Sequence, residues 1–153
     1  KAKENGVKVI LNPAPAQALS NELLSNIYMM IPNETEAELI SGIKVTDLDS
    51  AKKAADIICS KGVDIVVITM RSAGALLKEG NDYHLIPALK VKAVDTIAAG
   101  DTFCGAMSVA LSEGKGLQDA IKFANQCGAV TVTRMGAQAS IPYRKEVLVG
   151  ATV

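Results

Sequence analysis

The run Asp64-Ile-Val-Val-Ile-Thr69 decides the class of fold. Four consecutive apolar side chains, without the alternation of a half-exposed strand, are typical of a strand that is buried on both faces. Apolar residues at helical spacing precede this run, after the capping signal Thr46-x-x-Asp49. They are Leu48, Ala51, Ala55, Ile58 and Cys59. Because buried strands that alternate with amphipathic helices build parallel sheets, the pattern predicts an α/β fold with a mainly parallel sheet.

Segments on both sides of this run extend the sheet. Val7 to Leu11 and Ile27 to Ile31 are apolar runs that stop at proline, which cannot donate to a strand ladder, so both are expected to be strands. Ala75 to Ile86, with Gly80-Asn-Asp82 in its middle, is typical of a β-hairpin. We therefore expect strands of the sheet both before and after residues 64–69 in the sequence.

The C-terminal half is predicted to be helical. Apolar residues recur at helical spacing from Phe103 to Leu111 and again from Leu117 to Ala124. After Pro142 little pattern remains, and we expect a tail that is either truncated or loosely packed. At the other end, Lys1 to Gly6 is similar to the last turn of a helix with a glycine stop, which indicates that the chain begins inside a larger fold.

Composition excludes several classes of function. The 153 residues carry 16 basic and 16 acidic side chains, so no overall field favours nucleic acid or an anionic membrane. A single histidine argues against a clustered zinc site, and three cysteines without a Cys-x-x-Cys pair fit a reduced, cytoplasmic protein. No apolar run is long enough to span a bilayer. We therefore expect one cytoplasmic domain with neither nucleic-acid nor membrane partners.

The segment Asp95-Thr-Ile-Ala-Ala-Gly-Asp101 is the strongest candidate for chemistry. Its small residues stand where an apolar helix begins, so the first amides of that helix have no internal partner, and the helix dipole adds partial positive charge. Ala98, Ala99 and Gly100 allow a phosphate to approach the backbone closely. Asp101 lies in the same first turn, where it is either a general base or the N-cap of its own helix.

This segment resembles the signature of the ribokinase-like carbohydrate kinase family, in which glycine usually stands at the position of Ala98. Similar segments at Asn12–Ala16, Pro32–Glu36 and Val91–Asp95 extend the resemblance over most of the chain. The resemblance implies a three-layer α/β/α fold with a mainly parallel sheet. Residues 1–153 would form its C-terminal nucleotide-binding portion, without the N-terminal strands and the lid.

The resemblance also implies roles in catalysis and in binding ATP and Mg²⁺. Asp101 is similar to the base that takes the proton from a sugar 5-hydroxyl, and the amides of residues 98–101 are similar to an anion hole for the transferring phosphoryl group. Asn33-Glu-Thr-Glu36 resembles an element that acts near the magnesium and the phosphates. From residue types alone, Asn33 and Glu36 also form a capping box, and one pair can serve both purposes.

Two more segments resemble nucleotide-binding positions of the family. Thr69 to Gly74 is similar to its nucleotide loop, although glycine usually stands where this chain has Arg71. The Arg71 side chain either pairs with a phosphate oxygen or is solvated. Asn125 corresponds to a position that contacts the nucleotide, and the alternative is a polar residue on an exposed helix face.

A potassium-binding loop is implied by six residues: Asp95, Ile97, Thr131, Arg134, Gly136 and Ser140. Asp95 and Ser140 would supply side-chain oxygens, and the other four would supply backbone carbonyls. From its position alone, Arg134 is also explained as a cation that faces the C-terminal dipole of a helix.

The function that the resemblance implies is transfer of the γ-phosphoryl of Mg-ATP to the 5-hydroxyl of D-ribose. One alternative is a fructokinase-like or nucleoside kinase, and another is a nucleotide-binding fragment without catalysis. The family places its sugar-binding residues and lid in the N-terminal half, so we expect the isolated chain to be inactive and the complete protein to be a homodimer. Neither a Gly-x-x-x-x-Gly-Lys-Ser/Thr loop nor a Gly-x-Gly-x-x-Gly segment after the first strand is present.

Overall fold

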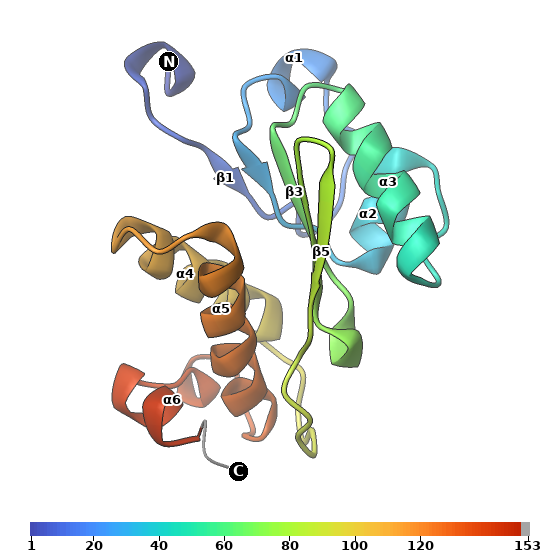
Figure 1. Cartoon of the computed structure of the whole chain (residues 1–153). Helices are drawn as coiled ribbons and strands as arrows, with labels where there is room; N and C mark the ends of the chain where they lie inside the picture. The colour runs from blue at the N-terminus through green and yellow to red at the C-terminus, as the bar shows by residue number, and fades with distance from the viewer. Residues whose placement is uncertain (151–153) are drawn as a thin grey trace. The chain divides into compact units, whose positions relative to one another are not determined.

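The computed structural model describes residues 1–150 of the chain (Figure 1). The chain forms two compact units. The first consists of Lys1–Met70 and Ala75–Leu85, and the second consists of Arg71–Gly74 and the chain from Ile86 onward. Residues that are close in sequence, such as Thr69 and Arg71, therefore belong to different units.

A five-stranded sheet in the order β1-β2-β3-β4-β5 organises the first unit. Its strands are β1 (Ile10–Leu11), β2 (Met29–Met30), β3 (Ile65–Thr69), β4 (Ala75–Glu79) and β5 (Asp82–Ile86). β1 pairs with β2, and β2 with β3, in parallel, whereas β3 pairs with β4 antiparallel. The sheet is thus mixed, with its parallel part at β1 to β3, and the predicted hairpin of β4 and β5 is confirmed.

The strands differ in how closely they follow the apolar runs. Residues 65–68 of β3 are all buried, so the prediction of a strand covered on both faces is confirmed. β1 is shorter than the expected strand from Val7 to Leu11. The Val9 carbonyl accepts hydrogen bonds from both Tyr28 N (3.0 Å) and Met29 N (3.1 Å), and this double contact interrupts the regular ladder.

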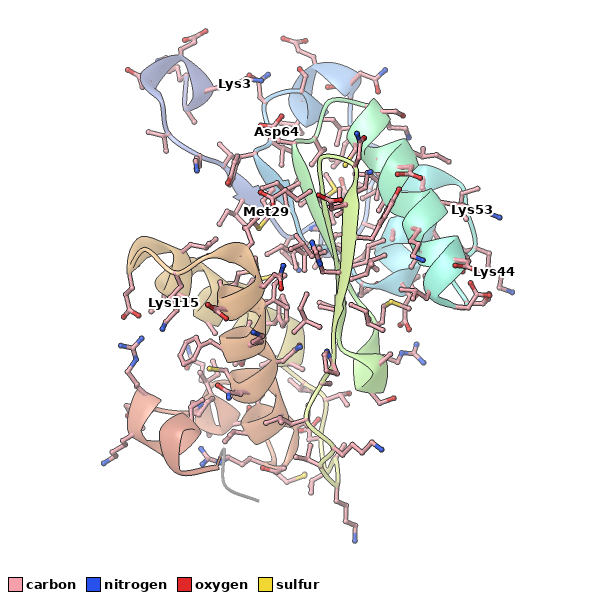
Figure 2. All side chains as sticks on the ribbon, in the orientation of Figure 1. Lys3, Met29, Lys44, Lys53, Asp64 and Lys115 are labelled. Atoms are coloured by element: carbon pink, nitrogen blue, oxygen red, sulfur yellow. The ribbon has the colours of Figure 1, made fainter. Side chains whose placement is uncertain are left out.

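Two helices, α2 (Glu34–Ser41) and α3 (Leu48–Ser60), pack on the sheet in the first unit, and a short helix, α1 (Asn21–Leu24), precedes β2 (Figure 1). Ala51, Ala54 and Ala55 of α3 are fully buried in one apolar cluster with Val66 and Ile68 of β3. These small side chains allow the helix to approach the strands closely. Figure 2 shows Lys53 on the outer side of α3, away from the sheet.

The cap of α3 differs from the predicted one. Asp47, not Thr46, is the N-cap, because Asp47 Oδ1 accepts a hydrogen bond from Ser50 N at 2.8 Å while Ser50 Oγ lies 3.0 Å from Asp47 N. Thr46 N donates to the same Ser50 hydroxyl at 2.9 Å. The capping box therefore ends at Ser50 rather than at Asp49, one residue later than the sequence pattern indicated.

The second unit is built on two helices, α4 (Ala99–Ser112) and α5 (Leu117–Val132), which pack against each other (Figure 1). Both predicted helices are therefore confirmed, and α4 begins four residues before the apolar stripe that indicated it. The buried residues include Met107 and Ala110 of α4 and Ala120 and Ala124 of α5. Two 3₁₀ turns, η2 (Arg71–Ala73) and η3 (Gln138–Ser140), complete the loops of this unit.

The segment after Pro142 forms helix α6 (Arg144–Gly150), so the expectation of a loosely packed tail is wrong for these residues. Glu146 Oε2 accepts a hydrogen bond from Tyr143 N at 2.7 Å and satisfies an amide at the start of the helix. Arg144 lies over the Phe123 ring and pairs with Glu113 at 2.6 Å. Residues 151–153 lie outside the described part. Within residues 1–150, no helix is both long and apolar enough to cross a membrane.

Candidate active site

In the first unit, the carboxyl ends of β2 and β3 bring Asn33 and Thr69 side by side. The two residues form a parallel bridge, in which Thr69 N donates to Pro32 O at 2.9 Å. Asn12, at the end of β1, donates from its side-chain amide to Ile31 O at 3.0 Å. Ligands of open α/β sheets bind beyond this edge. Asn12 is not among the predicted site residues, although its segment belongs to the family resemblance, and a polar residue at the end of a parallel strand is the signal that would have found it.

Asn33 and Glu36 form a reciprocal capping box at the start of α2. Glu36 Oε2 accepts from Asn33 N at 2.8 Å, and Asn33 Oδ1 accepts from Glu36 N at 2.9 Å. The structural interpretation of this pair is therefore confirmed. Glu36 is only 8% exposed, and its second carboxylate oxygen makes no hydrogen bond to residues 1–150. That oxygen remains available for a cation or for water.

Gly74, in the second unit, occupies a position that only glycine can fill. Its φ is 104°, and a Cβ atom there would lie 2.1 Å from Ile86 O and 2.6 Å from Ala88 N. Gly74 N donates to Arg71 O at 3.2 Å, which closes the 3₁₀ turn η2. Arg71 itself is exposed and has φ of 48°. The backbone of this loop therefore passes directly against the segment that follows β5.

Asn125 of α5 also contacts the segment that follows β5. Its side-chain amide donates to Ile86 O and to Pro87 O, both at 3.1 Å. The residue is 8% exposed, so the alternative of a polar residue on an exposed helix face is wrong. Because both amide hydrogens already have acceptors, a further ligand would meet the carbonyl oxygen of this side chain.

The start of α4 has the features of an anion site. Ala98, the N-cap, has φ of 60° and no side-chain oxygen, so Asp101 is the third residue of the helix and the alternative that makes it the N-cap is wrong. Among residues 1–150, the amides of Gly100 and Asp101 have no hydrogen-bond acceptor, and the Asp101 carboxylate has no partner. Gly100 and Asp101 are exposed. Two unpaired amides and a carboxylate thus share one helix end.

Asp95 joins the loop before α4 to the loop after α5. Its Oδ1 accepts from Ile97 N at 3.0 Å, and its Oδ2 accepts from Gly136 N at 3.1 Å. The amide of Ile97, followed by that of Gly136, holds the pKa of Asp95 below its usual range. The structure therefore brings three of the six predicted cation-site residues into direct contact through one carboxylate.

Of the other three predicted cation-site residues, Thr131 lies in the last turn of α5, and Arg134 and Ser140 follow its end. Thr131 O accepts from Arg134 N at 3.1 Å, and the buried Ser140 hydroxyl donates to Ala137 O at 2.7 Å. The Arg134 guanidinium forms an ion pair with Glu146 of α6 at 2.7 Å. In the part of the chain that the structure describes, His, Cys, Asp and Glu side chains form no group of three that could hold a metal ion.

Comparison with known proteins places these features in a family. The profile of the pfkB family of carbohydrate kinases matches residues 1–144. Ribokinase of Haemophilus influenzae is 50% identical over 147 residues, which are 96% of this chain and 48% of that protein. Ribokinase of Staphylococcus aureus is 51% identical over 147 residues, which are 95% of this chain and 48% of that protein. The chain thus spans about half the length of these relatives.

Solved structures agree in fold. Ribokinase from Thermotoga maritima superposes with a TM-score of 0.90 at 42% identity, over 99% of this chain and 51% of that one. Arabidopsis thaliana ribokinase, complexed with ribose and ATP, superposes with a TM-score of 0.93 at 32% identity, over 99% of this chain and 49% of that one. The ribokinase-like α/β fold is therefore shown. This chain belongs to the pfkB family of carbohydrate kinases.

Proposed function

We propose that this chain supplies the nucleotide-handling half of an ATP-dependent kinase that phosphorylates the 5-hydroxyl of D-ribose. The observation that carries the proposal is the start of α4, where two unpaired amides and an unpaired carboxylate lie within one helical turn. Identities of 50% and 51% to two ribokinases support ribose as the acceptor. Identity alone does not separate the sugars, since a deoxyribokinase of Salmonella typhi is 36% identical and the ribokinase of Lactococcus lactis is 34% identical.

In this proposal, the amides of Gly100 and Asp101 stabilise charge on the transferring phosphoryl group. The amides of Ala98 and Ala99 complete the anion hole once the Ala99 amide gives up its long bond to Thr96 O, at 3.3 Å. The left-handed conformation of Ala98 supports the idea, since it turns the chain into α4 without a side-chain cap that would occupy the amides. Phosphoryl transfer requires mainly positioning and charge stabilisation, which preorganised amides at a helix dipole provide.

Asp101 is the proposed general base. As the bond between the sugar oxygen and phosphorus forms, the hydroxyl proton moves to the Asp101 carboxylate and the ADP oxygen leaves. The lack of any hydrogen-bond or ion-pair partner for this carboxylate within the described residues supports the role, because such a partner would have to be displaced before the substrate could bind.

In the first unit, we propose a position for Mg²⁺. Glu36, whose second carboxylate oxygen makes no hydrogen bond within residues 1–150, is the proposed partner of a magnesium-bound water or of the ion itself, and its neighbour Asn33 forms the bridge to Thr69. Thr69 to Gly74, which includes Arg71, is the proposed nucleotide loop, and Asn125 of α5 is a further proposed contact of the nucleotide. The backbone of Gly74 and the buried amide of Asn125 support this by fixing the segment at Ile86. The bound magnesium would neutralise charge on the phosphates.

We also propose that Asp95, Ile97, Thr131, Arg134, Gly136 and Ser140 surround a potassium ion. A carboxylate held ionised by two backbone amides is a suitable hard oxygen donor, and the C-terminus of α5 adds partial negative charge. The chemistry that such an ion supplies is a fixed positive charge beside the loop that leads to the anion hole.

The test compares two polypeptides. One is this chain alone. The other is the complete protein, in which this chain is joined to a segment that corresponds to the remaining half of its relatives. Ribose-dependent release of ADP is measured with Mg²⁺ and K⁺. We expect clear turnover in the complete protein and almost none in the isolated chain. Full activity of the isolated chain would show that the sugar site is misplaced, and inactivity of the complete protein with every pentose and nucleoside would refute a kinase.

A further inference from the structure

Two threonine hydroxyls meet in the buried contact between α4 and α5. Thr131 Oγ1 lies 3.1 Å from Thr102 Oγ1, and the two residues are 0% and 5% exposed. The other buried side chains of the two helices are apolar, apart from Asn125. Buried hydroxyls are unfavourable unless they are paired, and valine has nearly the same shape without that requirement. Packing alone therefore does not explain why both positions carry threonine rather than valine.

The pair connects the two ends of the candidate site in the second unit. Thr102 directly follows Asp101, and its amide donates to Ala98 O at 2.9 Å, which closes the first turn of α4. Thr131 lies in the last turn of α5. The next residue, Val132, accepts hydrogen bonds through its carbonyl from Val94 N (2.7 Å) and Asp95 N (3.2 Å). The loop before α4 and the first turn of α4 are thus both tied to the end of α5.

The first turn of α4 has little local support. Its N-cap is Ala98, which makes no side-chain cap hydrogen bond, and Gly100 at the second position is a poor helix former. The same features leave the amides free for a phosphate. A helix start that is free to bind an anion therefore needs to be held from elsewhere in the structure.

Thr131 is well suited to that task because its own position is fixed. Its hydroxyl also lies 3.1 Å from Cys127 O, one turn earlier in α5. One hydroxyl proton cannot serve both partners, so when Thr131 donates to Cys127 O it accepts from Thr102. A threonine side chain divides between two main rotamers in a helix, and the bond to Cys127 O stabilises the one that Thr131 adopts.

We propose that the Thr102–Thr131 hydrogen bond is a positioning device for phosphoryl transfer. It holds the first turn of α4, and with it the amides of Gly100 and Asp101 and the Asp101 carboxylate, against the end of α5. This inference rests on the proposed kinase function. Neither threonine hydroxyl touches a substrate, so its loss lowers the rate of the chemical step rather than the affinity for nucleotide.

The kinetic test uses Thr102→Val and Thr131→Val in the complete protein. We expect kcat to fall on the order of tenfold or more for each, since small displacements of reacting groups have effects of this size, while the KM for ATP stays within about threefold. The double variant should be no worse than either single variant, because both remove the same bond. Thr102→Ser, which keeps the hydroxyl, should recover most of the lost kcat.

Thr133→Val is the matched control. Thr133 caps the same end of α5, and its exposed hydroxyl donates to Val130 O at 2.7 Å without reaching α4. We expect its kcat to be unchanged. If Thr102→Val keeps kcat within about twofold of the unsubstituted protein, or if Thr102→Ser loses as much as Thr102→Val, the proposal is overturned.

A second measurement is independent of catalysis. Amide hydrogen exchange of Thr102 reports whether the first turn of α4 is closed, because this amide donates to Ala98 O. In the complete protein, Thr131→Val should speed that exchange about tenfold, and Thr133→Val should leave it unchanged. Unchanged exchange in Thr131→Val refutes the positioning role. If the unsubstituted protein shows no kinase activity, the proposed function fails, and this exchange rate still decides whether the pair holds the helix start.

Discussion

Arg71 and Ala98 share a backbone conformation that side-chain-bearing residues rarely adopt, with φ of 48° and 60°. They are the two non-glycine residues with positive φ in the described part of the chain. Both stand where the motifs that this chain resembles usually have glycine. Glycine adopts positive φ without a steric cost, so this chain bears some backbone strain at both positions.

The strain at Ala98 predicts a stabilising substitution. Ala98→Gly removes a conformational cost of about 1 kcal/mol or more and adds some chain entropy to the unfolded state, so the free energy of unfolding should rise by about 0.5 kcal/mol. Ala98→Val should lower it by more than about 1 kcal/mol, because a β-branched residue fits this region worse. Urea denaturation gives both values, and the reverse order would show that Ala98 is not strained.

Gly74 is predicted to be irreplaceable for a different reason. In Gly74→Ala, the new methyl group would meet Ile86 O at 2.1 Å, and the backbone would have to move. We expect the free energy of unfolding to fall by about 3 kcal/mol. Gly80→Ala is the control, since Gly80 also has positive φ (56°) but nothing within 4 Å of a new Cβ, and about 1 kcal/mol is expected. Equal losses would mean that conformation alone matters.

The Asp101 carboxylate is predicted to be essential for turnover. Asp101→Asn in the complete protein should lower kcat about a thousandfold, as loss of a general base typically does, with little change in stability. Asp119→Asn is the control, because Asp119 also lies in the first turn of its helix and pairs only with the exposed Lys122 at 3.1 Å. Steady-state release of ADP measures both. A loss below about tenfold would leave Asp101 without a catalytic role.

An ion pair between the buried Lys78 and the half-exposed Asp56 predicts a pH dependence of stability. The Lys78 ammonium lies 2.8 Å from the Asp56 carboxylate. The hydrogen bond from Lys78 is the main cause that holds the pKa of Asp56 below its usual range. A carboxyl group whose pKa is lower in the folded protein stabilises the fold at pH values above its unfolded pKa of about 4. That stabilisation is lost as the pH falls through the pKa of the group in the folded protein. Stability should therefore decrease from about pH 4 downward, and Asp56→Asn should weaken that decrease.

At neutral pH, Asp56→Asn should lower the free energy of unfolding by about 2 kcal/mol, less than for a fully buried pair because half of the Asp56 side chain is exposed. Asp49→Asn on the same helix is the control. Asp49 pairs with Lys52 at 3.5 Å and is largely exposed, so about 0.5 kcal/mol or less is expected. Equal effects of the two substitutions would show that the burial of Lys78 adds nothing.

Short sequence patterns were sufficient to predict most helices and strands. They failed where two neighbouring residues could fill the same role. The apolar run at β3 and the hairpin of β4 and β5 were predictable because burial and turn chemistry act over a few residues. The cap of α3 was placed at Thr46 rather than Asp47, since both residue types cap helices and only the hydrogen bond to Ser50 separates them. The burial of Asn125 was not predictable, because its acceptors at Ile86 and Pro87 are far away in the sequence.

The sequence by itself determined the α/β class, the start of α4 in a stretch of small residues, and the presence of Asp101 in its first turn, because hydrophobic periodicity and helix starts are local properties. Only the tertiary structure decided that Asp95 reaches Gly136, that Thr102 meets Thr131, and that Ala98 adopts a left-handed conformation. The first two features depend on contacts between segments that lie some 30 to 40 residues apart, and the third opposes the local preference of alanine. Such contacts exist only once the chain has packed, and no local preference of the residues involved specifies them.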